Sequence, residues 1–253
     1  MIDIHSHIVW GVDDGARDRE QSLAMLKMAA EAGTTDIVAT PHADHQFKFD
    51  PKLVAERILD LGEATGNVPR IHRGCDLHMS LENINAVLKD PTPFTINGHC
   101  YLMVEFADAF VPPSTDEVLR QFVASGIVPV VTHPERNPIL QGAHKRLESW
   151  IELGCLMQVT AQCLTDRFGA VAQKAAWELL RKGMVHVIAS DAHDTQHRPP
   201  RLDQAREILT KEMGSEAAAL LLDENPGAII AGERRWIQAP VALAVAKKKW
   251  WFF

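Results

Sequence analysis

The chain has 253 residues, of which 46% are hydrophobic and 23% charged, a composition typical of globular proteins rather than of disordered or fibrous ones. Its formal net charge of −7 argues against a nucleic-acid-binding protein, because such proteins usually present a basic surface to the phosphates. No stretch of the sequence reaches the roughly 20 apolar residues of a membrane-spanning helix. The length suits one barrel of alternating strands and helices.

Cysteine and histidine usage bears on the compartment and on the chemistry. The 4 cysteines contain no CxxC pair, and no signal peptide precedes the acidic and histidine-rich start of the chain. We therefore expect a protein of the reducing cytoplasm. The 12 histidines are unusually many, and several stand beside Asp or Glu, as the ligands of a metal site do.

Short apolar runs recur along the chain, and segments with helical spacing lie between most of them. The predicted strands are 1–4, 36–40, 71–75, 101–106, 127–132, 155–159 and 185–190. The predicted helices are 19–32, 51–64, 115–124, 144–153 and 170–182, and the glycines that end helices are Gly33, Gly66, Gly126, Gly154 and Gly183. Strand and helix in alternation indicate parallel βα units. We predict an α/β fold, a seven-stranded relative of the TIM barrel.

The last part of the chain divides into closing helices and a distinct end. Helices are expected over 202–212, 215–222 and 225–232, so that residues 1–234 form one domain and 235–253 a tail. The tail ends in three lysines followed by Trp250, Trp251, Phe252 and Phe253. Lysine beside aromatic residues suits a weak contact with a membrane interface or a partner, whereas a simple mobile tail is commoner, and both interpretations remain open.

Metal-ligand residue types stand at nearly every strand end. In a parallel barrel these positions converge on one mouth. A single histidine there is more often structural, but repetition at equivalent points predicts a metal cluster. Imidazole and carboxylate without thiolate suit Mn²⁺, Fe²⁺ or Zn²⁺. The residues are His5, His7, Asp13, Asp14, His42, Asp76, Glu105, His133 with Glu135 and Arg136, and Asp191 with His193.

Such a cluster predicts phosphoester hydrolysis. Divalent ions activate water and neutralise the charge of a phosphoryl group. Arg136 and Arg198 lie three and five residues from the expected ligands His133 and His193, and a guanidinium group binds phosphate oxygens in two-point fashion. A surface salt bridge is the alternative for each arginine.

The motifs HSH, DDG, TPH, GCD, VEF, HPER and ASDAH follow one another in an order that resembles the PHP (polymerase and histidinol phosphatase) superfamily. Within it, MIDIHSHIVWGVDDG, with HPER and then HVIASDAH before RPP, resembles the bacterial PHP-class tyrosine-protein phosphatases of capsule and exopolysaccharide loci. The resemblance implies a distorted seven-stranded βα barrel with divalent ions, commonly manganese. It also implies hydrolysis of phosphotyrosine on a membrane-bound tyrosine autokinase, at the inner face of the membrane.

The resemblance also implies roles for individual residues. Asp76 departs from the pattern, in which a bridging Glu holds this position, and its shorter side chain puts the bridging role in question. One ion would be held by His5, His7, Asp191 and Asp76, a second by Asp76, Glu105 and His133, and a third by Asp14, His42 and His193, while Arg136 and Arg198 would bind the phosphate.

Other functions remain open from the sequence. The same cluster would serve a small-molecule phosphatase of the histidinol phosphate type or a broad phosphoesterase, and a PHP module without activity could act in binding. His193 or Glu135 could assist departure of the leaving group. Phe47, Phe49 and Phe110 fall in loops at the expected mouth, where they either sandwich an aromatic phosphoester or only pack.

Overall fold

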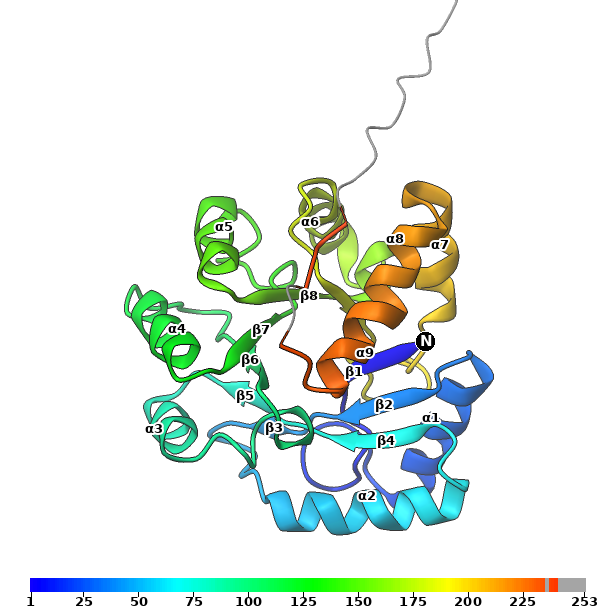
Figure 1. Ribbon diagram of the computed structural model, residues 1–253. Helices are drawn as coiled ribbons and strands as arrows, with labels where there is room; N and C mark the ends of the chain where they lie inside the picture. The colour runs from blue at the N-terminus through cyan, green and yellow to red at the C-terminus, as the bar shows by residue number, and fades with distance from the viewer. Residues whose placement is uncertain (235–236, 241–253) are drawn as a thin grey trace, which may run out of the picture.

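A computed structural model describes residues 1–234 and 237–240, and it shows parallel strands enclosed by helices (Figure 1). The strands form two sheets in which every pair is parallel, so the predicted α/β class is confirmed. The first sheet has the order β1 (Ile2–Ser6), β2 (Asp36–Ala39) and β4 (Arg70–Arg73). The second has the order β3 (His42–Ala43), β5 (Asp76–His78), β6 (Tyr101–Glu105), β7 (Val128–Thr132), β8 (Leu156–Thr160) and β9 (Val187–Ala189).

The described residues contain two more strands than predicted, because a short extra strand follows each of two predicted ones. All seven predicted strands are present, but β2 is followed by the separate β3, and β4 by β5. Pro41, between β2 and β3, has no N–H for the ladder. At Gly74 a Cβ atom would lie 3.0 Å from Cγ1 of Val38, so a side chain there would crowd the neighbouring strand. The chain therefore leaves the first sheet at these two points and enters the second.

The segment that follows β9 lies beside β1. The backbone N–H of Asp191 donates to the carbonyl of His5 at 2.8 Å, and the N–H of His7 donates to the carbonyl of Ala192 at 2.8 Å. These bonds bring the first and last strands together although they are almost two hundred residues apart.

Helices cover the outside of the strands (Figure 1). The five predicted helices between the strands are present, and the glycines after them have positive φ, as expected for helix ends. A further helix, α3, follows Ser80, whose Oγ accepts from the N–H of Asn83 at 3.2 Å. The helices are α1 (Arg19–Glu31), α2 (Pro51–Thr65), α3 (Leu81–Lys89), α4 (Thr115–Ala124), α5 (His144–Leu153), α6 (Gly169–Arg181), α7 (Asp203–Met213), α8 (Ser215–Ala219) and α9 (Asn225–Ile230), with a π-helical stretch η3 (Leu220–Glu224) and short 3₁₀ segments η1 (Ile96–Gly98) and η2 (Ala161–Leu164).

The described part of the predicted tail packs against the domain. Ile237 is buried in a cluster with Ile4, Val130 and Leu156, and the side chain of Asn225 donates to the carbonyl of Gln238 at 2.8 Å. The remainder of the predicted tail, 235–236 and 241–253, lies outside the described residues.

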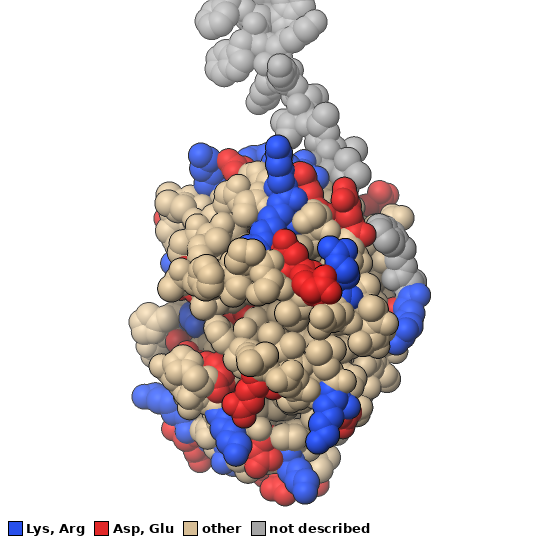
Figure 2. Space-filling view, turned by 90° about the vertical axis from the view of Figure 1, so that its left-hand side faces the viewer, with Lys and Arg blue, Asp and Glu red and all other residues tan. Residues whose placement is uncertain are grey.

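Two properties of the exterior concern partners. Of the described helices, none combines the length and the apolar character that a membrane crossing requires. On the face shown in Figure 2, basic and acidic side chains are interspersed among wider uncharged areas.

Candidate metal centre

The nine residues expected to bind metal come together where the strands end. They form four groups whose ligand atoms lie within 4.8 Å of one another, and each residue belongs to at least one group. The groups are His7, Asp14, His42 and His193; His5, His7 and Asp76; His5, His133 and Asp191; and His42, Asp76 and Glu105. Imidazole nitrogens and carboxylate oxygens so arranged suit the binding of several divalent ions.

His5 lies at the centre of the buried half of the cluster. Its Nε2 is 3.4 Å from Oδ2 of Asp76, 3.4 Å from Oδ1 of Asp191 and 3.3 Å from Nε2 of His7. None of these four side chains is more than 1% exposed. Donor atoms this close together could bind the same ion.

His42 occupies the more open half of the cluster. Its Nδ1 lies 3.5 Å from Oδ2 of Asp76 and 3.5 Å from Oε2 of Glu105, while its Nε2 lies 3.5 Å from Oδ1 of Asp14. Both ring nitrogens therefore face carboxylates. His193 Nε2 is 3.3 Å from the same Asp14 oxygen, and His133 Nε2 is 3.4 Å from Oε1 of Glu105.

Hydrogen bonds at Nδ1 turn three of the histidines so that Nε2 faces the cluster. His7 Nδ1 donates to Oδ2 of Asp13 at 2.7 Å, and His5 Nδ1 donates to Oε1 of Gln158 at 3.0 Å. His193 Nδ1 donates to the backbone carbonyl of Asp191 at 3.0 Å. Such outer contacts fix the tautomer and ring orientation of metal-binding histidines.

The position after the two aspartates, Gly15, has no room for a side chain. A Cβ atom at this position would lie 2.1 Å from the carbonyl oxygen of His7 and 2.5 Å from its Cβ. The loop can therefore fold back over the end of β1 only with glycine here, and it closes through the bond from the N–H of Ala16 to the carbonyl of His7 at 3.0 Å. This approach brings Asp13 behind His7 and Asp14 beside His193.

Unsatisfied buried atoms show that the cluster fits metal ions. Asp76 is 0% exposed, and neither of its carboxylate oxygens accepts a hydrogen bond from the described residues. Nε2 of His193 and Nδ1 of His42 are likewise buried without a hydrogen-bond partner in that part of the chain. Leaving such groups unpaired is costly, and a bound cation would satisfy them.

The ionisation of the cluster reflects its crowded charges. Burial opposes protonation of His7, but the Asp13 carboxylate, together with Asp191, raises its pKa to about 10. Burial, together with the positive His7, lowers the pKa of His193 to about 4. Burial disfavours the charged form of Asp191, yet His5, Arg136 and Arg198 hold the pKa of this carboxyl well below its usual range. An ion that binds here competes with a proton at His7.

Both predicted arginines contact one carboxylate of the cluster. The guanidinium groups of Arg136 and Arg198 both donate to Oδ2 of Asp191, whose Oδ1 faces the histidines. His133 and Asp191 have φ of 32° and 52°, in the left-handed region that few non-glycine residues adopt. Such backbone conformations concentrate at functional sites.

Comparisons with known proteins identify the family of this chain. A family model for capsular polysaccharide synthesis, CpsB/CapC, matches residues 1–231. The chain belongs to the CpsB/CapC family. The chain is 34% identical to the tyrosine-protein phosphatase CpsB of Streptococcus pneumoniae over 239 residues, which cover 91% of this chain and 98% of that protein. It is 30% identical to the tyrosine-protein phosphatase YwqE of Bacillus subtilis, with 95% of each chain covered.

Solved structures extend the comparison. A crystal structure from a study of YwqE and CpsB, termed unique metal-dependent tyrosine phosphatases, matches with a TM-score of 0.88 at 29% identity and covers 96% of this chain and 99% of that one. A β-aspartyl dipeptidase from Fervidobacterium islandicum matches with a TM-score of 0.60 at 13% identity, which shows the fold alone. The resemblance drawn from the motifs is therefore confirmed at the level of the family.

Several residues of this CpsB/CapC chain have surroundings that the sequence did not indicate. Phe168 lies against both arginines that contact Asp191, with guanidinium carbons 4.5 Å (Arg136) and 5.9 Å (Arg198) from its ring centre. Glu135 is fully buried, and its Oε1 accepts from the N–H of Thr160 at 2.8 Å. It therefore lies behind the cluster rather than in the open mouth.

The three loop aromatics have different surroundings. Phe47 stacks on His42 with ring centres 6.2 Å apart, so it borders the cluster. Phe49 packs on Phe94 at 5.6 Å, whereas Phe110 is 63% exposed. Phe49 is therefore a packing residue, and Phe47 is the loop aromatic that borders the cluster.

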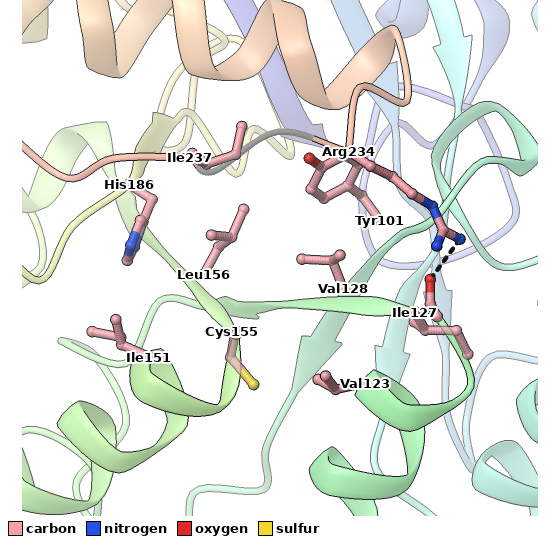
Figure 3. A pocket seen from close by; sticks show the side chains of 12 residues that line it. Tyr101, Val123, Ile127, Val128, Ile151, Cys155, Leu156, His186, Arg234 and Ile237 are labelled. Carbon is pink, nitrogen blue, oxygen red and sulfur yellow. Dashed lines mark hydrogen bonds between the residues drawn. The ribbon is translucent and has the colours of Figure 1, made fainter.

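Two hollows differ in their relation to the cluster. A polar hollow of about 590 Å³ extends from Asp14 and His193 and is lined also by Arg17 and His197. An apolar cavity of about 360 Å³ lies at the opposite ends of the strands, between α4, α5 and the segment that contains Ile237 (Figure 3). Arg234 borders this cavity and donates to the carbonyl of Gly126 at 3.0 Å. None of the candidate metal or phosphate residues lines it.

Proposed function

We propose that this chain is a metal-dependent tyrosine-protein phosphatase that hydrolyses phosphotyrosine in another protein. The observation that carries the proposal is the convergence of nine imidazole and carboxylate side chains on one partly buried cluster, beside two arginines. The named activities of the CpsB and YwqE relatives support the choice of phosphotyrosine as substrate. We take the two sheets to form a distorted barrel that aims all the strand ends at this point.

The proposed cofactor is Mn²⁺, with Fe²⁺ or Zn²⁺ as alternatives for the same donors. Divalent ions in this cluster would supply Lewis acidity that activates water and neutralises phosphoryl charge. We propose that these ligands hold two or three ions. His7 belongs both to the group with Asp14, His42 and His193 and to the group with His5 and Asp76, so it could bind either neighbouring ion. The proposed ligands are His5, His7, Asp14, His42, Asp76, Glu105, His133, Asp191 and His193.

Arg136 and Arg198 would bind the phosphate. Both guanidinium groups now share Oδ2 of Asp191, and each has further N–H donors for phosphate oxygens. A planar, permanently charged group suits the equatorial oxygens of the reacting phosphoryl group. Asp13 and Gln158 would act indirectly, since they orient His7 and His5.

The partner proposed from the family resemblance is a membrane-bound tyrosine autokinase that controls polysaccharide synthesis. The enzyme would meet it in the cytoplasm at the inner face of the membrane. The lysine and aromatic residues near the end of the sequence would add a weak membrane contact. Deleting residues 241–253 tests this last point, because vesicle binding would then fall while hydrolysis of a soluble phosphopeptide would not.

The first experiment compares two substrates on chelated enzyme reloaded with Mn²⁺. We expect faster hydrolysis of a phosphotyrosine peptide than of histidinol phosphate, and loss of this activity in His5→Ala. Hydrolysis of the small metabolite alone would retain the metal site but reject the protein substrate. No hydrolysis of either substrate, with ions bound, would rule out the proposed enzymatic function and favour a binding module.

A further inference from the structure

One aromatic ring lies against both arginines of the proposed phosphate site. The guanidinium carbon of Arg136 is 4.5 Å from the ring centre of Phe168, and that of Arg198 is 5.9 Å from it. A cation at this distance from an aromatic face is attracted to it. Phe168 is half-buried and packs against the main hydrophobic core, so the ring itself has a fixed support.

The turn that contains Phe168 also holds the loop of Arg198. Nη1 of Arg167 donates to the carbonyls of Gln196 and His197 at 3.1 and 3.2 Å. The turn is closed by the bond from the N–H of Gly169 to the carbonyl of Asp166 at 2.8 Å. One short segment before α6 therefore fixes the backbone next to Arg198 and the side chains of both arginines.

The arginines need such support because their anchor is shared. Arg136 comes from the turn after β7 and Arg198 from the loop after β9, yet both bind the same oxygen of Asp191. Nε of Arg198 is buried without a hydrogen-bond partner among residues 1–234 and 237–240. A long arginine side chain loses much conformational freedom when it is ordered, and prior ordering reduces that loss on ligand binding.

We propose that Phe168 is a positioning residue that holds Arg136 and Arg198 in one arrangement, ready to receive the phosphate of the substrate. The inference rests on the proposed function, because it assumes that these arginines bind phosphate. Phe168 carries no metal-ligand atom and lies outside the candidate ion-binding groups. Its contribution therefore belongs to binding of the phosphate more than to the chemical step.

The test replaces the ring while retaining an apolar side chain. In Phe168→Leu we expect the KM for a phosphotyrosine peptide and the inhibition constant of inorganic phosphate each to rise about tenfold, with kcat changed less than about threefold. Phe168→Tyr keeps an aromatic face, so its KM and inhibition constant should stay close to those of the unaltered protein. Phe94→Leu is the matched control, since Phe94 is half-buried in the same core but contacts Phe49 instead of an arginine.

A second measurement does not depend on turnover. Calorimetric titration of Mn²⁺-loaded protein with inorganic phosphate should show the same weakening in Phe168→Leu, at unchanged Mn²⁺ content. Unaltered phosphate binding in this variant would overturn the positioning role. Equal losses in Phe168→Leu and Phe94→Leu would also overturn it, because they would indicate general loss of packing. Failure of the proposed function is distinguishable, since phosphate binding would then be insensitive to Arg136→Lys and Arg198→Lys as well.

Discussion

Nδ1 of His7 lies 2.7 Å from Oδ2 of Asp13, and this aspartate is not a member of any candidate ion-binding group. The same oxygen accepts from the backbone N–H of His42 at 3.1 Å, while Oδ1 accepts from the N–H of Gly15 at 3.0 Å. Asp13 thus joins two of the candidate ligands to the loop that follows β1. Its neighbour Asp14 faces the cluster, so the two consecutive aspartates have different tasks.

Asp13→Asn should weaken metal binding without removing a ligand. The amide can turn its NH₂ group toward His7, which would favour the wrong tautomer of the imidazole. We expect an affinity for Mn²⁺ lower by about 10- to 100-fold, and a matching loss of activity at limiting metal. Titration of chelated protein with Mn²⁺ measures the effect. Asp108→Asn, at an exposed loop position, should bind Mn²⁺ as the unaltered protein does, and equal loss in both variants would contradict the role of Asp13.

Asp76→Asn should reduce the stabilisation that ions confer. A ligand that binds only the folded protein raises its stability by mass action, and the gain depends on affinity. Because both Asp76 oxygens are buried and accept no hydrogen bond from the described residues, we expect ions to depend on this carboxylate. The rise in melting temperature on addition of Mn²⁺ should shrink markedly in this variant. An undiminished rise would place the ions away from Asp76.

Gly15→Ala should destabilise the protein strongly, because the new methyl group would overlap the backbone of His7. We expect a loss of roughly 2 to 4 kcal/mol in the free energy of unfolding, together with loss of metal binding. Gly142→Ala is the matched control, since no atom lies within 4 Å of a Cβ there. The control should be neutral or more stable by up to about 1 kcal/mol. Urea unfolding of chelated proteins gives both values, and equal effects would contradict the proposed close approach.

His186 should make stability depend on pH. Burial lowers its pKa from 6.5 to about 4, and its Nδ1 accepts from the N–H of Met157 at 3.1 Å. Between these two pH values the unfolded chain binds a proton that the folded chain does not. The free energy of unfolding is therefore full above pH 6.5 and falls as the pH decreases toward 4, by roughly 3 kcal/mol in total.

The measurement is urea unfolding of chelated protein over this pH range, with His186→Gln for comparison. Glutamine can still accept the bond from Met157 but does not titrate. The unaltered protein should lose more stability than the variant between about pH 6.5 and about pH 4.5. Parallel curves for the two proteins would show that His186 carries no such effect.

The order of elements was predictable because each strand is a short apolar run followed by a polar residue. This pattern placed His5, His7, His133 and Asp191 at strand ends, where the structure has them. Helix α3 escaped prediction because it is short and buries only Val87 among its own residues. Pro41 marks the end of β2 in the sequence, but the pairing of β3 with β5 joins distant segments and was not predictable from local pattern.

Contacts between loops could not be predicted from the sequence either, because they join segments that are distant along the chain. The two aspartates after β1 are chemically alike, and only the path of the chain over His7 separates Asp13 from Asp14. Phe168 stands in an ordinary turn, and its value depends on two arginines that are 32 and 30 residues away in opposite directions. Residue type indicated the chemistry, whereas the support of each side chain required the fold.

With ions and phosphate bound as proposed, Asp191 would make ion binding and anion binding interdependent. One of its oxygens faces the imidazoles, and the other receives both guanidinium groups. An ion that changes the charge or position of this carboxylate changes its interaction with the arginines and so the affinity for phosphate. Thermodynamic reciprocity requires phosphate to change the affinity for the ion by the same factor. Phosphate affinity should therefore report on ion occupancy, and ion affinity on phosphate. The affinity for either ligand can therefore be measured only at a fixed concentration of the other.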